Sequence, residues 1–251
     1  MTKTIPESLL EALAYIENLL NDGQIGQALS FCEQLLVSHP QEKELLLLYA
    51  IALQIKGERK ESLNILQKLA KSNADSSEIW NHYALILFEE HRFEEAHRTL
   101  QYSLELDPKN PFAWWLKSIF RTFQHDPQGS ERAYLYARWL EPESYPPYPS
   151  FSESDLLSIF ESIKEELSEK QQEICAMLFW NVLEIPTISH LEQLQTSPII
   201  PLIFLESTQM TIHIFRQNIR RLGIEEETLS GILKEELIMA LENSHFNTIL
   251  A

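Results

Sequence analysis

A 34-residue period runs through the first three-fifths of the chain. In its clearest copy, residues 77–110, apolar residues recur at helical spacing on both sides of a polar turn, which predicts two short amphipathic helices. Steps of one period land on small side chains at one position: Ala28, Ser62, Ala96 and Ser130. They land on proline or alanine at another: Pro40, Ala74, Pro108 and Pro142. Small residues let helix axes approach where they cross, and proline ends a helix. Four copies in register predict a helical solenoid.

This pattern resembles the tetratricopeptide repeat (TPR), with predicted repeats at 9–42, 43–76, 77–110 and 111–144. The alternative, a plain helical bundle, requires no fixed 34-residue step. The fourth copy is the least regular, because its turn at 124–129 carries Pro127, and we expect a distorted cap there. One turn position holds glycine in two copies and histidine in two: Gly23, Gly57, His91 and His125. Glycine suits a left-handed helix end, so the two histidine turns are expected to differ.

The resemblance implies that the first helix of each repeat lines a concave groove that holds a peptide or a helix. The positions it assigns to this groove are Leu13, Glu17, Leu47, Ile51, Asn81, Leu85, Phe88, Trp115 and Ile119. One subset of the family grips a C-terminal carboxylate with Lys, Arg and Asn side chains on these helices. Only Asn81 is of that kind here, so we reject a carboxylate clamp. The apolar members, with Leu85 and Trp115 taken as surface positions, favour an amphipathic helix as partner, unless another part of this chain covers the groove.

Composition excludes several classes of function. The net charge of −17 disfavours nucleic acid and anionic membranes as partners, and it favours a basic one. Six glycines and no matching motif argue against a phosphate-binding loop. Residues 1–8 do not have the apolar core of a signal peptide, and no apolar run is long enough to span a membrane, so we expect a cytoplasmic protein. Cys32 and Cys175 are expected to be buried, reduced thiols.

Three prolines within residues 145–151 predict a stiff linker to a second domain, residues 152–251. A helix is expected at 152–167, and a capping box of Ser152 and Asp155 begins it. Residues 164–170 are interpreted as the charged end of this helix. A buried strand is expected at 176–183, a short helix at 188–194, a half-buried edge strand at 211–215 and a long last helix at 225–243.

This order of elements resembles a bacterial family of zincin-like metallopeptidases, the minimal gluzincins, whose last helix carries His-Glu-x-x-His. Two histidines one helical turn apart bind zinc, and the glutamate polarises a water molecule. The corresponding positions here are Met239, Ala240 and Asn243, and the chain contains no His-x-x-x-His. We therefore predict a degenerate peptidase domain with no catalytic residue, metal or cofactor. The remaining histidines are interpreted as surface, packing or frayed-end residues: His82, His91, His97, His190, His213 and His245 beside Glu242.

The resulting hypothesis is a mainly α protein, a TPR solenoid followed by a small α+β zincin-like domain, that acts as a non-catalytic adaptor or scaffold for a protein partner. Two alternatives stay open: a zinc-dependent peptidase, which the missing motif disfavours, and an acidic TPR-type chaperone for a secreted basic client.

Overall fold

The computed structural model describes residues 8–72, 75–149, 151–194, 197–199, 202–206, 209–222, 224 and 226–243. The chain divides into two compact units, Met1–Glu141 and Pro142–Ala251. The N-terminal lead, the start of the last helix at Glu225, and His245 lie outside the described residues.

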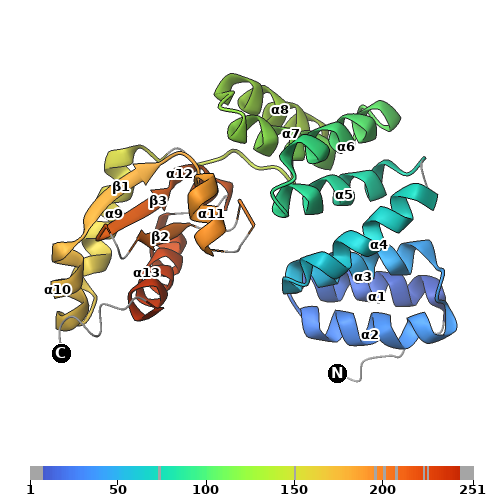
Figure 1. Ribbon diagram of the computed structural model, residues 1–251, viewed down its shortest axis with the longest axis horizontal. Helices are drawn as coiled ribbons and strands as arrows, with labels where there is room; N and C mark the ends of the chain where they lie inside the picture. Colours follow the sequence, from blue (N-terminus) through green and yellow to red (C-terminus); the bar gives the residue numbers. More distant parts are fainter. Residues whose placement is uncertain are drawn as a thin grey trace. The chain divides into compact units, whose positions relative to one another are not determined.

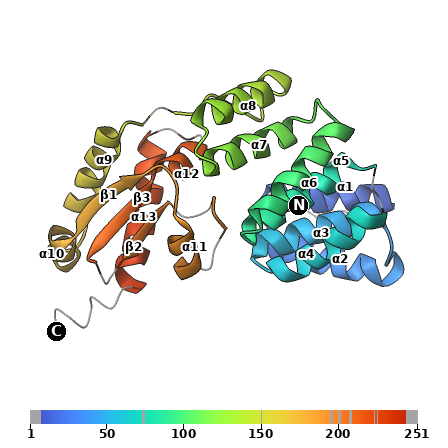
Figure 2. The same cartoon turned by 45° about the horizontal axis from the view of Figure 1, so that its top comes forward.

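Eight helices pack in consecutive pairs in the described part of the first unit (Figure 1). They are α1 (Leu9–Asn21), α2 (Ile25–Ser38), α3 (Lys43–Lys56), α4 (Arg59–Ser72), α5 (Ser77–Glu89), α6 (Phe93–Leu106), α7 (Pro111–Phe123) and α8 (Pro127–Leu140). Figure 2 shows the last pair, α7 and α8, side by side.

The small residues of the 34-residue period lie where paired helices approach. Ala28 and Ala96 are fully buried. The hydroxyl of Ser62 donates to the carbonyl oxygen of Ala50 on the facing helix at 2.8 Å. The hydroxyl of Ser130, which is half-buried, shares a hydrogen bond of 2.8 Å with the hydroxyl of Thr122 on the facing helix. A serine therefore replaces alanine at the crossing without leaving a buried polar atom unsatisfied.

All four turns between paired helices have one conformation. The backbone φ angle is 70° at Gly23, 93° at Gly57, 59° at His91 and 57° at His125. The expectation that the histidine turns differ is therefore wrong. Each turn residue donates its N–H to the carbonyl three residues earlier, and the next residue donates to the carbonyl five residues earlier. This pair of bonds satisfies the last carbonyls of the first helix, so the repeat imposes the left-handed conformation even on histidine.

The second unit combines helices with a three-stranded sheet. Its elements are α9 (Glu153–Glu165), α10 (Glu169–Met177), β1 (Phe179–Leu183), α11 (Ile188–Leu194), β2 (Ile203–Glu206), β3 (Thr211–Phe215), α12 (Arg216–Arg221) and α13 (Glu226–Asn243). The strand order is β1-β3-β2, with β1 parallel and β2 antiparallel to β3. Ile212 faces Trp180 on one side and Leu205 on the other.

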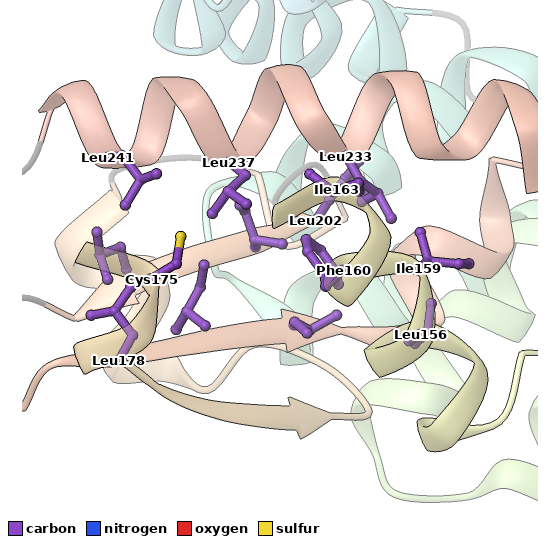
Figure 3. Close-up of a cluster of buried hydrophobic side chains, with 14 of the residues drawn as sticks. Leu156, Ile159, Phe160, Ile163, Cys175, Leu178, Leu202, Leu233, Leu237 and Leu241 are labelled. Atoms are coloured by element: carbon purple, nitrogen blue, oxygen red, sulfur yellow. The ribbon is translucent and has the colours of Figure 1, made fainter. Parts of the chain in front are cut away.

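One face of this sheet carries the core of the second unit. Leu233, Leu237 and Leu241 lie along one stripe of α13, fully or almost fully buried, and point towards α9 and α10 (Figure 3). Phe160 from α9 and Ile212 and Ile214 from β3 complete the layer. Leucines four residues apart fall on one side of a helix, so the spacing of α13 determines which side packs.

Several predictions for this unit hold and several are wrong. The capping box of Ser152 and Asp155 is present, and α11 and α13 lie where expected. The predicted charged end at 164–170 instead contains the start of a new helix, α10, at a second capping box of Ser168 and Gln171. That helix takes residues 176 and 177 from the predicted strand.

The roles of the two predicted strands are exchanged. β1 pairs on one side only and Phe179 is 73% exposed, so it is an edge strand and not a buried one. β3 is the central strand and almost wholly buried. The alternation of apolar and polar residues in β3 wrongly indicated an edge strand. Both faces of β3 are covered, one by the core and the other by aromatic residues. β2 was not predicted, because two prolines shortly before it, Pro198 and Pro201, mask a four-residue strand.

The segment before α9 is anchored within the second unit. The Nε of Arg220 donates to the carbonyl oxygen of Pro149 at 3.1 Å. Burial lowers the pKa of Arg221 to about 10, and the nearby Tyr148 opposes this shift. Both cysteines are buried and free, as predicted. None of the helices in the described ranges combines the length and apolarity that a membrane span requires.

Candidate functional site

Most of the predicted groove residues are buried in the folded chain. Leu47, Asn81, Leu85, Phe88 and Ile119 are at most 9% exposed. Ile51, Trp115 and Leu13 are half-buried, and Glu17 is exposed. The interpretation of Leu85 as a surface position is therefore wrong.

Contacts between successive helices explain this burial. The ring of Phe88 stacks on Phe120 of α7 with centroids 4.5 Å apart, and it meets Phe93 and Phe123 edge to face. The Oδ1 of Asn81 lies 2.6 Å from the hydroxyl of Ser103 on α6. These side chains hold the helices together and cannot also reach a ligand. Spacing alone does not separate the floor of a groove from its surface.

An aromatic patch remains partly open on the same helices. It consists of His82 on α5 and Phe112 and Trp115 on α7, all half-buried. Phe112 stacks on Trp115 with centroids 5.5 Å apart and an interplanar angle of 17°, and His82 lies 5.2 Å from Phe112. The Nδ1 atom of His82 is buried and has no hydrogen-bond partner among the described residues. Burial lowers the pKa of His82 to about 4, so the ring is neutral at pH 7.

A second feature, the basic pocket, lies between α7 and α8. Its volume is about 330 Å³. Its walls are Trp114, Lys117, Arg121, Asp126, Gly129, Arg132, Ala133 and Tyr136. The α7 members follow at intervals of three and four residues, which places them on one side of the helix.

The rim of the basic pocket is built around Asp126. Its Oδ1 accepts the N–H of Gly129 at 2.8 Å and caps α8, while its Oδ2 accepts from Arg121 at 3.1 Å. A Cβ atom on residue 129 would lie 2.1 Å from that Oδ2, so the arrangement requires glycine there.

Two cations of the basic pocket have no acidic partner among the described residues. The Nζ of Lys117 lies 4.1 Å from the ring centre of Trp114, and Arg132 is exposed. Burial, and then the nearby charge of Arg121, lower the pKa of Lys117. Residues 111–140 contain four basic and two acidic residues, whereas residues 9–110 contain nine and sixteen. Sequence reasoning missed this pocket, although Lys117 and Arg121 stand where repeat 3 has the apolar Tyr83 and Leu87.

The second unit gathers the only trio of metal-binding side chain types within the described residues: His190, Glu206 and His213. Their ligand atoms lie within 4.8 Å of one another, and His213 Nε2 is 3.2 Å from Glu206 Oε2. The three residues come from three different elements, α11, β2 and β3. The carboxylate of Glu206 lies on β2, the strand that was not predicted.

A hydrogen bond to the ring of His190 favours a proton over a metal at this cluster. The backbone N–H of Thr187 donates to Nδ1 of His190 at 3.2 Å, and the hydroxyl of Thr187 accepts from the backbone N–H of His190 in return. Neutral His190 therefore carries its proton on Nε2, whereas a metal-bound histidine donates from its other nitrogen. Burial and the neighbouring His213 lower the pKa of His190. As arranged, the cluster does not fit a metal ion.

Comparison with known proteins concerns the repeats. A family model described as tetratricopeptide repeat matches residues 19–86. Residues 19–86 therefore carry tetratricopeptide repeats. Among solved structures, TTC0263, a TPR protein of Thermus thermophilus, is 17% identical, with a TM-score of 0.50 over 54% of this chain and 75% of that one. MamA (41-end) of Desulfovibrio magneticus RS-1 is 14% identical over 53% of this chain and 75% of that one, with a TM-score of 0.44.

A chain in the APC/C hetero-tetramer Cut9–Hcn1 is 18% identical, with a TM-score of 0.49 over 54% of this chain and 26% of that one. No curated protein matches the sequence. Because the identity is low, the match to TTC0263 shows that the two chains share a fold and does not show a shared function. The chain is thus mainly helical with a small sheet, and its first unit has a TPR-like solenoid fold, which suggests a protein-interaction scaffold. The gluzincin resemblance of residues 152–251 stays a prediction.

Proposed function

We propose that this protein is a non-catalytic scaffold whose TPR unit binds a polypeptide through the aromatic patch. The partly open, stacked pair of Phe112 and Trp115 is the observation that supports this function. Tryptophan is frequent among the residues that dominate binding energy, because a large rigid ring buries much apolar area at little entropic cost.

The buried groove residues support the patch from below. Phe88 of α5 stacks on Phe120 of α7, and Ile119 of α7 is fully buried, so the rings are presented on a rigid surface and little order is lost on binding. Ile51 extends the half-buried apolar surface to α3. An amphipathic helix, with apolar side chains at intervals of three and four residues, is the partner that such a surface suits.

The second unit is included as a non-catalytic domain. Met239 and Ala240 of α13 stand where the metallopeptidase resemblance requires a zinc ligand and a general base, and neither side chain can serve. The trio of His190, Glu206 and His213 does not supply a substitute, because the N–H of Thr187 occupies Nδ1 of His190 and the ring proton occupies Nε2. We propose in addition that the protein is bacterial and that it acts in the cytoplasm.

A pull-down that measures how much partner polypeptide the full chain recovers tests this function. Trp115→Glu places a charge in the aromatic patch, and the control Val37→Glu introduces the same charge at an 86% exposed position of α2. We expect Trp115→Glu to reduce recovery of the partner at least about 10-fold, as for a hot-spot residue, with unchanged circular dichroism. Val37→Glu should leave recovery unchanged. Equal recovery by both variants would exclude the patch as the binding surface.

Zinc content separates the scaffold from the peptidase. Stoichiometric zinc that survives dialysis of the purified chain would overturn the non-catalytic assignment. A client that aggregates without this protein would instead support the chaperone alternative.

A further inference from the structure

We propose that the basic pocket between α7 and α8 binds a carboxylate on an acidic segment of the partner polypeptide. This inference rests on the proposed scaffold function, since it names the chemistry of the segment that the TPR unit would hold.

Charge supplies the first argument. Arg121 is already paired with Asp126, which leaves Lys117 and Arg132 as cations without an acidic partner in the described part of the chain. Two cations on facing helices, one half-buried over a tryptophan ring, form a site for one anionic group. A hydrogen bond between an ammonium or guanidinium group and a carboxylate is roughly twice as strong as one between neutral groups.

The shape of the pocket supplies the second argument. Trp114 meets Tyr136 edge to face with centroids 4.7 Å apart, and Tyr136 stacks on Trp139, which is 71% exposed. These rings give the cations an apolar wall, where water screens a charge pair less than on an open surface. A volume of about 330 Å³ accommodates a single side chain and its backbone, and not a folded element.

A polar end cap is the competing explanation, because the terminal repeat of a solenoid needs a soluble outer face. A cap can use charges of either sign, and this chain has 37 acidic and 20 basic residues. Net charge does not separate the two explanations, because repeat 2 (43–76) carries +2 and repeat 4 (111–144) carries 0. An end cap does not require that two cations without acidic partners line one pocket, as Lys117 and Arg132 do in the described part of the chain. At physiological salt, charges more than about 8 Å apart are largely screened, so the acidic residues elsewhere in the chain do not prevent the pocket from binding an anion.

Isothermal titration of the full chain tests the pocket with three blocked peptides: Ser-Glu-Glu-Ser-Glu-Glu-Ser, the same peptide with glutamine for glutamate, and the glutamine peptide with a central phosphoserine. We expect the glutamate peptide to bind, more weakly at higher salt, and the glutamine peptide not to bind. Binding of the phosphoserine peptide alone would overturn the assignment to a carboxylate. Failure of all three to bind would reduce the pocket to an end cap.

Variants locate the site. Lys117→Met keeps the aliphatic stem over Trp114 and removes the charge, and Arg132→Gln removes the second cation. Arg138→Gln removes one positive charge from the same helix but outside the pocket. We expect a loss of about 10-fold or more for the double variant Lys117→Met/Arg132→Gln and less than about 2-fold for Arg138→Gln. Equal losses would mean that only net charge matters, and the proposal would fail.

The titration also separates this inference from the scaffold function. If Trp115→Glu loses the partner but still binds the glutamate peptide, both proposals hold at different surfaces. If the glutamate peptide binds to the pocket while Trp115→Glu captures the partner normally, the pocket stands and the aromatic patch fails. If the glutamate peptide does not bind while Trp115→Glu loses the partner, the pocket fails and the scaffold stands.

Discussion

Repeats 3 and 4 have the same framework. In repeat 3, Trp80 meets Tyr102 edge to face at 4.9 Å, and one period later Trp114 meets Tyr136 in the same way at 4.7 Å. The turn residues His91 and His125 have φ angles of 59° and 57°. The period therefore specifies the backbone and the contact within each helix pair.

The two repeats differ on one side of their first helix. Tyr83 and Leu87 are buried in repeat 3, and the hydroxyl of Tyr83 accepts from Gln67 of the preceding helix α4. The residues one period later are the charged Lys117 and Arg121, which line a pocket. The residues at a repeat position, and not the repeat framework alone, therefore determine which surfaces are available for binding.

Exchanging the apolar and charged residues at this repeat position should have the largest effect on stability. Leu87 is 1% exposed, so Leu87→Arg buries a charge without a partner. We expect a loss of about 4 kcal/mol of stability, and so a much lower urea midpoint for the helical circular dichroism signal. The reverse change, Arg121→Leu, removes an ion pair whose members are about one-third exposed and should cost at most about 1 kcal/mol. Similar midpoints for both variants would show that repeat 3 does not depend on burying this face.

The sequence predicted the repeats well, because their period combines local signals that agree. Small residues at crossings, turn residues and helix ends all recur at one step, and each reports on contacts within a single period of the chain. The binding surface was harder. Leu85 and Trp115 were both assigned to the concave groove, but only contacts with neighbouring helices decide that the first is buried and the second half-buried.

The second unit shows the same limit. Its helices have strong local signals, such as the capping box at Ser152 and the leucine stripe of α13. The place of β1 and β3 in the sheet depends on pairing between residues that are distant in the chain, as between Trp180 and Ile212. The trio of His190, Glu206 and His213 is brought together by that pairing, so no local pattern reveals it.

A titration should reveal a difference between repeats at another equivalent position, where repeat 3 has His82 and repeat 4 has Leu116. The folded-state pKa of His82 is about 4, below its ordinary value of 6.5, so the unfolded chain binds a proton first as the pH falls. Stability from this group is full above pH 6.5 and decreases between pH 6.5 and 4. Because the residue is only half-buried, we expect a loss of about 1–3 kcal/mol over this window.

His82→Leu gives repeat 3 the residue of repeat 4 and isolates this contribution, since carboxylates that also titrate are common to both proteins. Urea denaturation at several pH values should give a shallower pH dependence for the variant between pH 4 and 6.5. Parallel curves would mean that His82 is protonated as readily in the folded chain as in the unfolded one.

The smallest expected effect compares the turns. Gly23 and Gly57 adopt the left-handed conformation with no side-chain penalty, whereas His125 adopts it with a Cβ atom at a cost of about 1 kcal/mol. His125 is exposed, so His125→Gly relieves this cost without removing a core contact, although glycine also gains entropy in the unfolded chain. We therefore expect a gain of roughly 0.5 kcal/mol, visible as a small increase in the urea midpoint. A decrease would indicate that the histidine side chain stabilises the turn of repeat 4 beyond its backbone geometry, which would make this turn unlike those of the first two repeats.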